Sequence, residues 1–413
     1  MTQNTTSPHV TVIIPTRERA DVLEKSLKTC TTQDYDNLTI LVSDNCSGDR
    51  TKEVVLSAND KRVQYLRAGQ RLSMSHNYEF ALSHVSEGWV TIIGDDDGLL
   101  PGSIARVIDI IAATGVDAIR SDTCLYRWPG LQGSEFGSLA IPLKSGLEVR
   151  NSGHWLSAVM AGRALYPNLP MLYSGGFARV SKLLEIKAKS GKFYYSCIPD
   201  VYSAMAIASV IKEYIYSYEP FAIDGVSVHS IGTSLVQGGP SGPAKQFLME
   251  DNIPLHQDIP TAPDGSVPRV HQAWIYETYL QSHFLRNGVN ECSHEQQLKV
   301  ALASPACDSA AEEWGKIFAA NHRLDFNAIL KKAKRQRWRL ALLENSRRLS
   351  HALYTHYCVG DGTTPLKDVY EASLVAGNVR HQLPGPIETV RNLAAKTRAK
   401  WGDRRRDVAT APR

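Results

Sequence analysis

The sequence predicts an α/β protein with a mostly parallel central sheet, helices on both faces of that sheet, and an α-helical region after it. Three observations carry this prediction. Between residues 10 and 120, short apolar runs alternate with segments of helical spacing, which is the order of a doubly wound sheet. Polar residues stand where several of the apolar runs end. From residue 268 on, the pattern changes to helical spacing.

Length and composition are those of a globular protein of two or three domains. The chain has 413 residues, and an apolar content of 43% supports a substantial core. The formal net charge is only +4, which argues against a nucleic-acid-binding protein. Seven scattered cysteines without metal-ligand spacing suit reduced thiols in the cytoplasm. The N-terminus lacks a signal-peptide pattern, and no apolar run reaches the roughly 18 residues that span a membrane, so we expect a soluble or peripheral protein.

The elements of the first part of the chain follow from the pattern of apolar residues. Strands are expected where short apolar runs end in proline or polar residues, at 10–14, 38–42, 63–66 and 90–93. Helices are expected where apolar residues recur at helical spacing, at 21–30, 49–58, 74–85 and 104–111. The sequence contains neither GxGxxG nor GxxxxGK[ST], so a dinucleotide-binding Rossmann domain and a P-loop are not supported.

The acidic run after the strand at 90–93 is the most informative motif. Asp95, Asp96 and Asp97 follow Gly94 directly. Adjacent carboxylates repel one another, so the cluster is costly unless a cation lies among them. Hard cations such as Mn²⁺ and Mg²⁺ take oxygen ligands, and open α/β sheets bind ligands at the carboxyl ends of their strands. We therefore expect a metal–nucleotide site here; the alternative is a solvated acidic turn.

Two further strand ends carry residues that can contact a nucleotide. Pro15 and Thr16 lead into Arg17 and Arg19, whose guanidinium groups can stack on a base or reach a phosphate. Asp44 ends the next strand and can accept hydrogen bonds from a base or a ribose. Each alone is what an ordinary polar loop shows. Three such loops at one edge of a sheet indicate a shared site.

The segments VTVIIPTRERADVL, ILVSDNCSGD and TIIGDDDGLLPGS together resemble family 2 of the inverting glycosyltransferases, which have the GT-A fold. The resemblance implies a nucleotide-diphospho-sugar donor and a Mn²⁺ or Mg²⁺ ion. It places Asp44 at the base, Asp95 and Asp96 at the ribose, and Asp97 and Asp95 at the metal and diphosphate. Family members often have an aromatic residue where this chain has Arg17, so the identity of the donor is less predictable.

The resemblance implies roles for four more residues. Arg71 and Asn77 stand where the family often places polar residues facing the diphosphate; for Arg71 a surface role is the alternative. Asp200 opens a helix and corresponds to the general base on the acceptor hydroxyl, although Pro199 replaces the Glu that often precedes it and a plain helix cap is the alternative. His229 corresponds to a late metal ligand; a structural histidine is the alternative.

The domain organisation follows from composition. We expect a catalytic domain over residues 1–240, with a donor half over about 1–120 and an acceptor half over about 121–240. Residues 241–267 are expected to form a linker or a mobile loop, residues 268–395 a helical region, and residues 396–413 a basic, disordered tail. Residues 331–340 form a basic amphipathic segment, which predicts peripheral contact with an anionic membrane at the inner face of the plasma membrane. A solvated helix face is the alternative.

The sequence thus predicts a metal-dependent inverting glycosyltransferase of bacterial surface glycan or polysaccharide synthesis. Its partners would be a nucleotide-diphospho-sugar and a glycan or lipid-linked acceptor, with no nucleic acid. A sugar nucleotidyltransferase would require a glycine-rich basic loop near the N-terminus, and PTRERAD is not one. A non-catalytic scaffold subunit is the other alternative, and the retained aspartates argue against it. A processive enzyme is excluded, because position 334 is Lys rather than the Gln of QxxRW and no spanning helix is expected.

Overall fold

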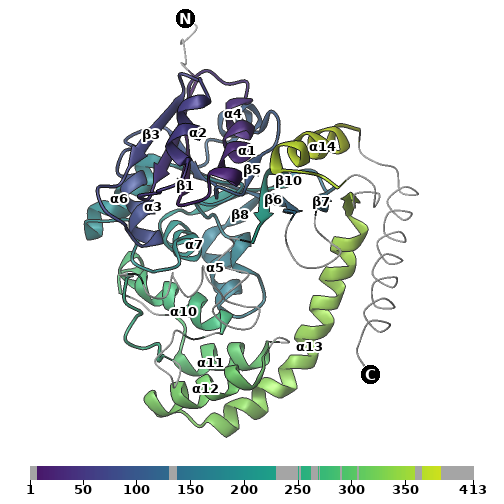
Figure 1. The fold of residues 1–413 in the computed structure, drawn as a ribbon. Coiled ribbons are helices and arrows are strands. Elements are labelled where there is room, and N and C mark those ends of the chain that lie inside the picture. Colours follow the sequence, from purple (N-terminus) through teal and green to yellow (C-terminus); the bar gives the residue numbers. More distant parts are fainter. Residues whose placement is uncertain are drawn as a thin grey trace, which may run out of the picture.

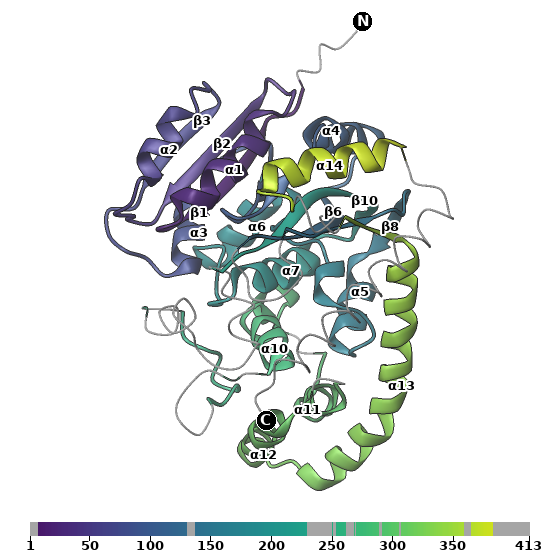
Figure 2. The same cartoon turned by 45° about the vertical axis from the view of Figure 1, so that its right-hand side comes forward.

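The computed structural model describes residues 7–129, 137–228, 250, 253–261, 268, 270–288, 291–304, 307–358 and 365–382. A central sheet with its helices forms the upper part of the molecule in Figure 1, and helices α10 to α13 extend below it. Helix α13 runs along one edge of the molecule in both views (Figures 1 and 2). No helix among the described residues is long and apolar enough to cross a bilayer.

In the described part of the chain, eleven strands form one sheet, in the order β11-β7-β6-β9-β4-β1-β2-β3, with β10 pairing β6, β8 and β5. The strands are β1 Val10–Thr16, β2 Leu38–Asp44, β3 Val63–Arg67, β4 Trp89–Ile92, β5 Gly98–Leu99, β6 Ala118–Arg127, β7 Leu139–Pro142, β8 Leu147–Asn151, β9 Gly176–Arg179, β10 Glu213–Val226 and β11 Thr355–Cys358.

The predicted α/β class is confirmed, with one correction to the sheet. Strands β3, β2, β1 and β4 are parallel, so Thr16 and Asp44 are paired at the end of β1 and β2. Strands β6 and β10 are also parallel. The other described pairings, made by β5, β7, β8, β9 and β11, are antiparallel. The sheet as a whole is therefore mixed: β6 and β7 follow each other directly, whereas β5, β8, β9 and β11 pair with strands far away in the sequence.

Helices cover both faces of the sheet, as predicted. They are α1 Ala20–Thr31, α2 Thr51–Ser57, α3 Met74–Leu82, α4 Ser103–Thr114, α5 Ser152–Met160, α6 Val180–Ser190 and α7 Pro199–Val210, with a 3₁₀ turn η1 at Tyr166–Asn168. Alternation along β1 decides the faces: Val12 and Ile14 pack with α1, α2 and α4, whereas Ile13 packs with α3, α6 and α7. Burial of each such side chain contributes about 1.5–3 kcal/mol.

The C-terminal region is helical, as predicted, and it returns to the sheet. Its helices are α10 His271–Gln281, α11 His294–Ala303, α12 Ser309–Asn321, α13 Phe326–Leu353 and α14 Val369–Gln382, with a 3₁₀ turn η2 at His283–Arg286. After α13, strand β11 pairs with β7, with Thr355 opposite Pro142. Val369 and Ala372 of α14 then pack against Tyr126 of β6. The last described helix therefore covers the sheet.

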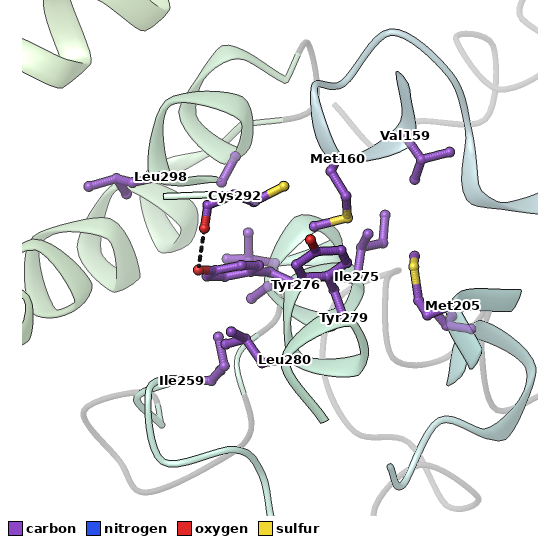
Figure 3. Close-up of a cluster of buried hydrophobic side chains, with 14 of the residues drawn as sticks. Val159, Met160, Met205, Ile259, Ile275, Tyr276, Tyr279, Leu280, Cys292 and Leu298 are labelled. Carbon is purple, nitrogen blue, oxygen red and sulfur yellow. Dashed lines mark hydrogen bonds between the residues drawn. The ribbon is translucent and has the colours of Figure 1, made fainter. Parts of the chain in front are cut away.

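One apolar cluster joins the helical region to the sheet-bound helices (Figure 3). It contains Met160 of α5, Met205 of α7, Ile275 of α10 and Leu298 of α11. The Tyr276 hydroxyl in this cluster donates to the carbonyl oxygen of Cys292 across 3.3 Å. Because close-packed interiors transmit displacement, α7 is held in place by helices far along the chain. The predicted domain boundaries remain predictions.

Candidate functional site

The loop after β1 is joined to the first aspartate of the acidic run. Thr16 Oγ1 donates to Asp95 Oδ2 at 2.8 Å, and Arg19 Nη1 donates to Asp95 Oδ1 at 2.9 Å. Asp95 is buried. Thr16 and Arg19, which the sequence assigned to the nucleotide, thus both contact Asp95. Pro15, which precedes them, is buried in β1.

The other two aspartates are held by the end of β10. Ser227 Oγ donates to Asp96 Oδ2 at 2.6 Å. Asp97 Oδ1 accepts from the backbone N–H of Gly225 at 2.7 Å, while its Oδ2 accepts from Ser174 Oγ at 2.7 Å and from the backbone N–H of Gly94 at 2.8 Å. The three carboxylates therefore lie at one place but are oriented by different partners.

A fourth carboxylate, Asp224 of β10, belongs to this cluster and was not predicted. Asp224 directly precedes Gly225 in the strand, and its Oδ2 accepts a hydrogen bond from Thr123 Oγ1 at 2.6 Å. Burial, followed by the charge of Asp224, raises the pKa of Asp97. Burial, followed by the charges of Asp97 and Asp95, raises the pKa of Asp96. Mutual repulsion in a dry site favours a bound cation.

The residues fit a divalent cation. A Cβ added to Gly94 would lie 2.9 Å from Asp97 Oδ2, 2.9 Å from the Tyr173 hydroxyl oxygen and 3.1 Å from Asp96 Oδ1. These oxygen atoms lie so close to the backbone at residue 94 that a side chain larger than that of glycine would displace them. No group of three His, Cys, Asp or Glu side chains suited to a metal is found among the described residues. Mg²⁺ in nucleotide sites needs only one or two carboxylates, with substrate phosphates as further ligands.

Residues assigned to the base of the nucleotide are engaged by the protein itself. Asp44 is fully buried, and its Oδ2 accepts from the Tyr65 hydroxyl at 2.5 Å and from Arg67 Nη1 at 2.8 Å. Its Oδ1 accepts from the backbone N–H of Ser47 at 2.8 Å. Arg17 forms an ion pair with Glu250. Before Asp44 or Arg17 could contact a nucleotide base, their present partners, Tyr65 and Arg67 for Asp44 and Glu250 for Arg17, would have to move away.

The remaining predicted donor-side residues lie around the start of α3. Asn77 is buried, and its Oδ1 accepts from Ser43 Oγ at 2.9 Å, which joins α3 to the end of β2. Arg71 is exposed in the preceding loop, and within the described ranges no hydrogen bond or ion pair joins its side chain to the aspartates. His229 lies outside the described residues.

Asp200 lies in the first turn of α7, whose N-cap position is Ile198. Asp200 is therefore not the helix cap. The Tyr166 hydroxyl donates to Asp200 Oδ2 at 3.2 Å. Burial raises the pKa of Asp200, and hydrogen bonds from the backbone N–H of Val201 and from Tyr166 oppose this shift. A carboxylate that has a raised pKa and is oriented by a hydrogen bond has the properties of a general base.

The structure brings Asp200 and the acidic run to one site. Burial, followed by the charges of Asp200, Asp97 and Asp95, raises the pKa of Tyr78, so the charges of these three carboxylates act on the same phenol. Arg120 joins their supports: its Nε donates to the carbonyl oxygen of Pro167 in η1 at 2.8 Å, and its Nη1 donates to that of Tyr173 at 3.0 Å. Neither Arg120 nor Tyr166 was predicted. Each is a single residue without a motif.

Comparison with known proteins agrees with the sequence pattern. Residues 11–126 match the model of the family described as Glycosyl transferase family 2. A GalNAc(5)-diNAcBac-PP-undecaprenol beta-1,3-glucosyltransferase of Campylobacter jejuni subsp. jejuni is 38% identical over 192 residues, which cover 45% of this chain and 56% of that protein. An uncharacterized glycosyltransferase of Rickettsia typhi is 28% identical over 111 residues, which cover 27% of this chain and 34% of that protein. The chain thus spans about half the length, or less, of these relatives.

Two solved structures are similar in outline. S. aureus TarS 1-349 in complex with UDP has a TM-score of 0.43 at 14% identity, over 83% of this chain and 92% of that chain. Mannosyltransferase PcManGT from Pyrobaculum calidifontis, in complex with GDP-Man and Mn²⁺, has a TM-score of 0.40 at 19% identity, over 81% and 88%. TM-scores this low add no weight to the assignment. Residues 11–126, which hold β1 to β4 and the three aspartates, are therefore similar to glycosyl transferase family 2.

Proposed function

We propose that this chain transfers a sugar from a nucleotide-diphospho-sugar to an acceptor hydroxyl, with inversion at the anomeric carbon. The observation that carries the proposal is the half-buried pair of Asp200 and Tyr166 together with the buried aspartates that follow β4. The aspartates that follow β4 suit a metal-bound diphosphate, and Asp200 suits an acceptor hydroxyl. A scaffold protein has no need for buried aspartates at such a site, because buried carboxylates are costly in the absence of ligand.

Asp200 is the proposed general base. It would take the proton from the acceptor hydroxyl as the oxygen attacks the anomeric carbon on the face opposite the leaving diphosphate, which inverts that centre. Burial raises the pKa of Asp200 and so strengthens it as a base, while the Tyr166 hydroxyl holds one oxygen in place. Base and leaving group act on opposite sides of the sugar, as a single displacement requires.

The donor would lie along the ends of β1, β2 and β4. Asp97 would hold Mn²⁺ or Mg²⁺, and Asp95 and Asp96 would complete the metal shell or bind the ribose. When bound, such an ion neutralises charge on the departing diphosphate. Thr16 and Arg19 fix Asp95, which is then oriented toward the ribose. Arg71 and Asn77 flank the diphosphate, Pro15, Arg17 and Asp44 form the base side, and a further metal contact from His229 completes the proposed set.

We also propose a lipid-linked glycan acceptor and peripheral binding to the cytoplasmic face of an anionic membrane. The Campylobacter relative is named as acting on a glycan linked to PP-undecaprenol. Helix α13 offers a suitable surface: Trp338, Leu342, Leu349 and Leu353 are 57%, 59%, 61% and 45% exposed. Their spacing of four, seven and four places them on one face, and exposed Lys331, Lys334 and Arg335 continue it. We call these seven residues the α13 stripe.

A screen of nucleoside diphosphates by thermal shift, with and without Mn²⁺, tests the donor site. Stabilisation by one diphosphate that depends on Mn²⁺ is expected, and release of sugar from the matching nucleotide sugar should follow. No shift with any diphosphate would favour the scaffold alternative. Asp200→Asn should then abolish transfer and leave diphosphate binding nearly intact, with Asp109→Asn, an exposed change on α4, as matched control. An Asp200→Asn variant with most of its activity would refute the base.

A further inference from the structure

A cavity lies apart from the acidic run, on the side of the sheet where α5 and the end of α13 meet the sheet. Its volume is about 460 Å³, and residues of β7, β8, β10, α5 and β11 line it. Figure 2 shows α5 below β8 and β10, three of the elements that line the cavity, with α13 beside them. The volume lies within the range of about 300–1,000 Å³ usual for small-ligand sites. None of the predicted site residues lines it.

The wall of this cavity is a fixed stack of rings and one guanidinium group. Arg150 lies between Trp155 and Tyr216, with its guanidinium carbon 3.8 Å and 3.4 Å from the two ring centres. Its Nε and Nη2 donate to Glu148 Oε2 at 3.0 Å and 2.9 Å. Flat aromatic surfaces set in place before a ligand arrives reduce the entropy lost on binding.

The mouth of the cavity carries positive charge. The Lys144 ammonium group lies 5.0 Å from the ring centre of Tyr354 and 5.6 Å from that of Tyr218. In the described ranges its partners are these rings rather than a carboxylate. Arg163 and His154 also line the cavity. The acid among the lining residues, Asp122, accepts a hydrogen bond from the Tyr216 hydroxyl. Lys144, whose described partners are aromatic rings, thus places a positive charge at the mouth of the cavity, which favours an anion.

A short link joins the cavity to the proposed base. Asn168 lines the cavity, and its carbonyl oxygen accepts from the Tyr214 hydroxyl at 2.5 Å. Tyr166, the donor to Asp200, is the first residue of the same 3₁₀ turn. One such turn rises about 6 Å. A ligand in the cavity therefore lies against the turn that orients Asp200.

We propose that this cavity binds the acceptor, a glycan that carries a negatively charged phosphate or carboxylate group. The inference rests on the proposed function and names the acceptor class. A sugar ring packs on Trp155 and Tyr354, and the anionic group lies at Lys144. The glycan then extends past η1, which brings its free hydroxyl toward Asp200.

Binding of three probes to the full chain, measured by titration calorimetry, tests the proposal. They are an N-acetylhexosamine joined by diphosphate to a short prenol, a disaccharide that contains glucuronate, and the same disaccharide with glucose in its place. At least one anionic probe should bind about tenfold or more tightly than the neutral disaccharide, and which one binds distinguishes diphosphate from carboxylate. Lys144→Glu and Trp155→Ala should each weaken it about tenfold. Lys52→Glu, an exposed change on α2, is the matched control.

Three results would overturn the cavity assignment: no binding of any probe, equal affinity for neutral and anionic probes, or unchanged affinity in Lys144→Glu. Lys144 is exposed, so this variant should fold even where Trp155→Ala does not. A nucleoside diphosphate titrated into the same samples separates the two proposals. Its failure to bind the wild type would contradict the proposed function. Normal diphosphate binding without anionic acceptor binding would contradict the cavity alone.

Discussion

The Tyr166 hydroxyl donates to Asp200 Oδ2 across 3.2 Å and so joins η1 to the first turn of α7. The backbone next to Tyr166 is fixed by a hydrogen bond, because Arg120 Nε donates to the carbonyl oxygen of the following residue, Pro167. Pro199 stands where related enzymes often have a glutamate beside the base. Tyr166, 34 residues before Asp200 in the chain, provides the polar partner that Pro199 cannot provide. The proposed base, Asp200, is therefore oriented by tertiary structure rather than by its sequence neighbour.

Tyr166→Phe should shift the pH dependence of transfer. The lost hydrogen bond lowers the pKa of Asp200 in the wild type, so its removal raises that pKa further. The acid limb of the profile of kcat against pH should move to higher pH by about one to two units, since a hydrogen bond to a charged group is worth about 1.5–3 kcal/mol and each pKa unit about 1.4 kcal/mol. The KM for the donor should not change. Tyr35→Phe, whose hydroxyl donates to the carbonyl oxygen of Pro8, is the control. An unmoved acid limb would show that Tyr166 has no influence on the base.

Gly94→Ala should impair the metal-dependent binding of the donor. The new methyl group would lie 2.9 Å from Asp97 Oδ2 and from the Tyr173 hydroxyl oxygen, so it would displace the carboxylate that we assign to the ion. The Mn²⁺-dependent affinity for the nucleoside diphosphate should fall about tenfold or more, together with a loss of stability of about 1–3 kcal/mol. Gly153→Ala, which meets its nearest atom only at 3.7 Å, should behave as the wild type. Equal Mn²⁺ dependence in both variants would place the ion elsewhere.

The sequence predicted the elements whose pattern is local. The strands from β1 to β4 and the helices from α1 to α4 agree with prediction to within a few residues, because apolar spacing alone determines them. Strand β10 was missed, since Glu213–Val226 mixes charged, aromatic and apolar residues and depends on pairing with β6. Strand β11 was missed for a similar reason: its four residues form a strand only against β7.

The site was predictable where chemistry is concentrated in adjacent residues. Asp95, Asp96 and Asp97 were identified as a group, but the partner of each depends on other strands and loops, such as Ser227 for Asp96. Asp224 offered a weak signal in the sequence. It is a carboxylate beside a glycine in an otherwise apolar run, from Phe221 to Val226, just as the acidic run after β4 lies beside a glycine. Contacts between single residues far apart in sequence leave no such trace.

The α13 stripe predicts binding to anionic lipid. Leu342→Asp combined with Leu349→Asp should lower the fraction of protein that sediments with vesicles containing anionic lipid, because two exposed apolar contacts are replaced by charges of the same sign as the lipid. Leu56→Asp, on α2 and 61% exposed, is the matched control. Binding of wild type should weaken as salt rises. Equal sedimentation of all three proteins would identify the stripe as a solvated helix face.

Glu277 should make the stability of the protein depend on pH. This residue of α10 is fully buried, and its Oε2 accepts from Ser196 Oγ at 2.6 Å, in the segment that leads to Asp200. Burial raises the pKa of Glu277 from 4.5 to about 7. Because the folded state holds the proton more tightly than the unfolded state, its contribution is fully present below pH 4.5 and is lost as the pH rises through about 7.

Glu277→Gln tests this directly, because glutamine has nearly the shape of the protonated side chain and cannot ionise. Urea unfolding at pH 5 and pH 8 should show that the wild type loses more stability than the variant over this interval. The difference should be up to about 3 kcal/mol, since each pKa unit is worth about 1.4 kcal/mol. Glu313→Gln, an exposed change on α12, should follow the wild type. If the glutamine variant loses as much stability as the wild type, another group accounts for the pH dependence, and Glu277 is ionised in the core at both pH values.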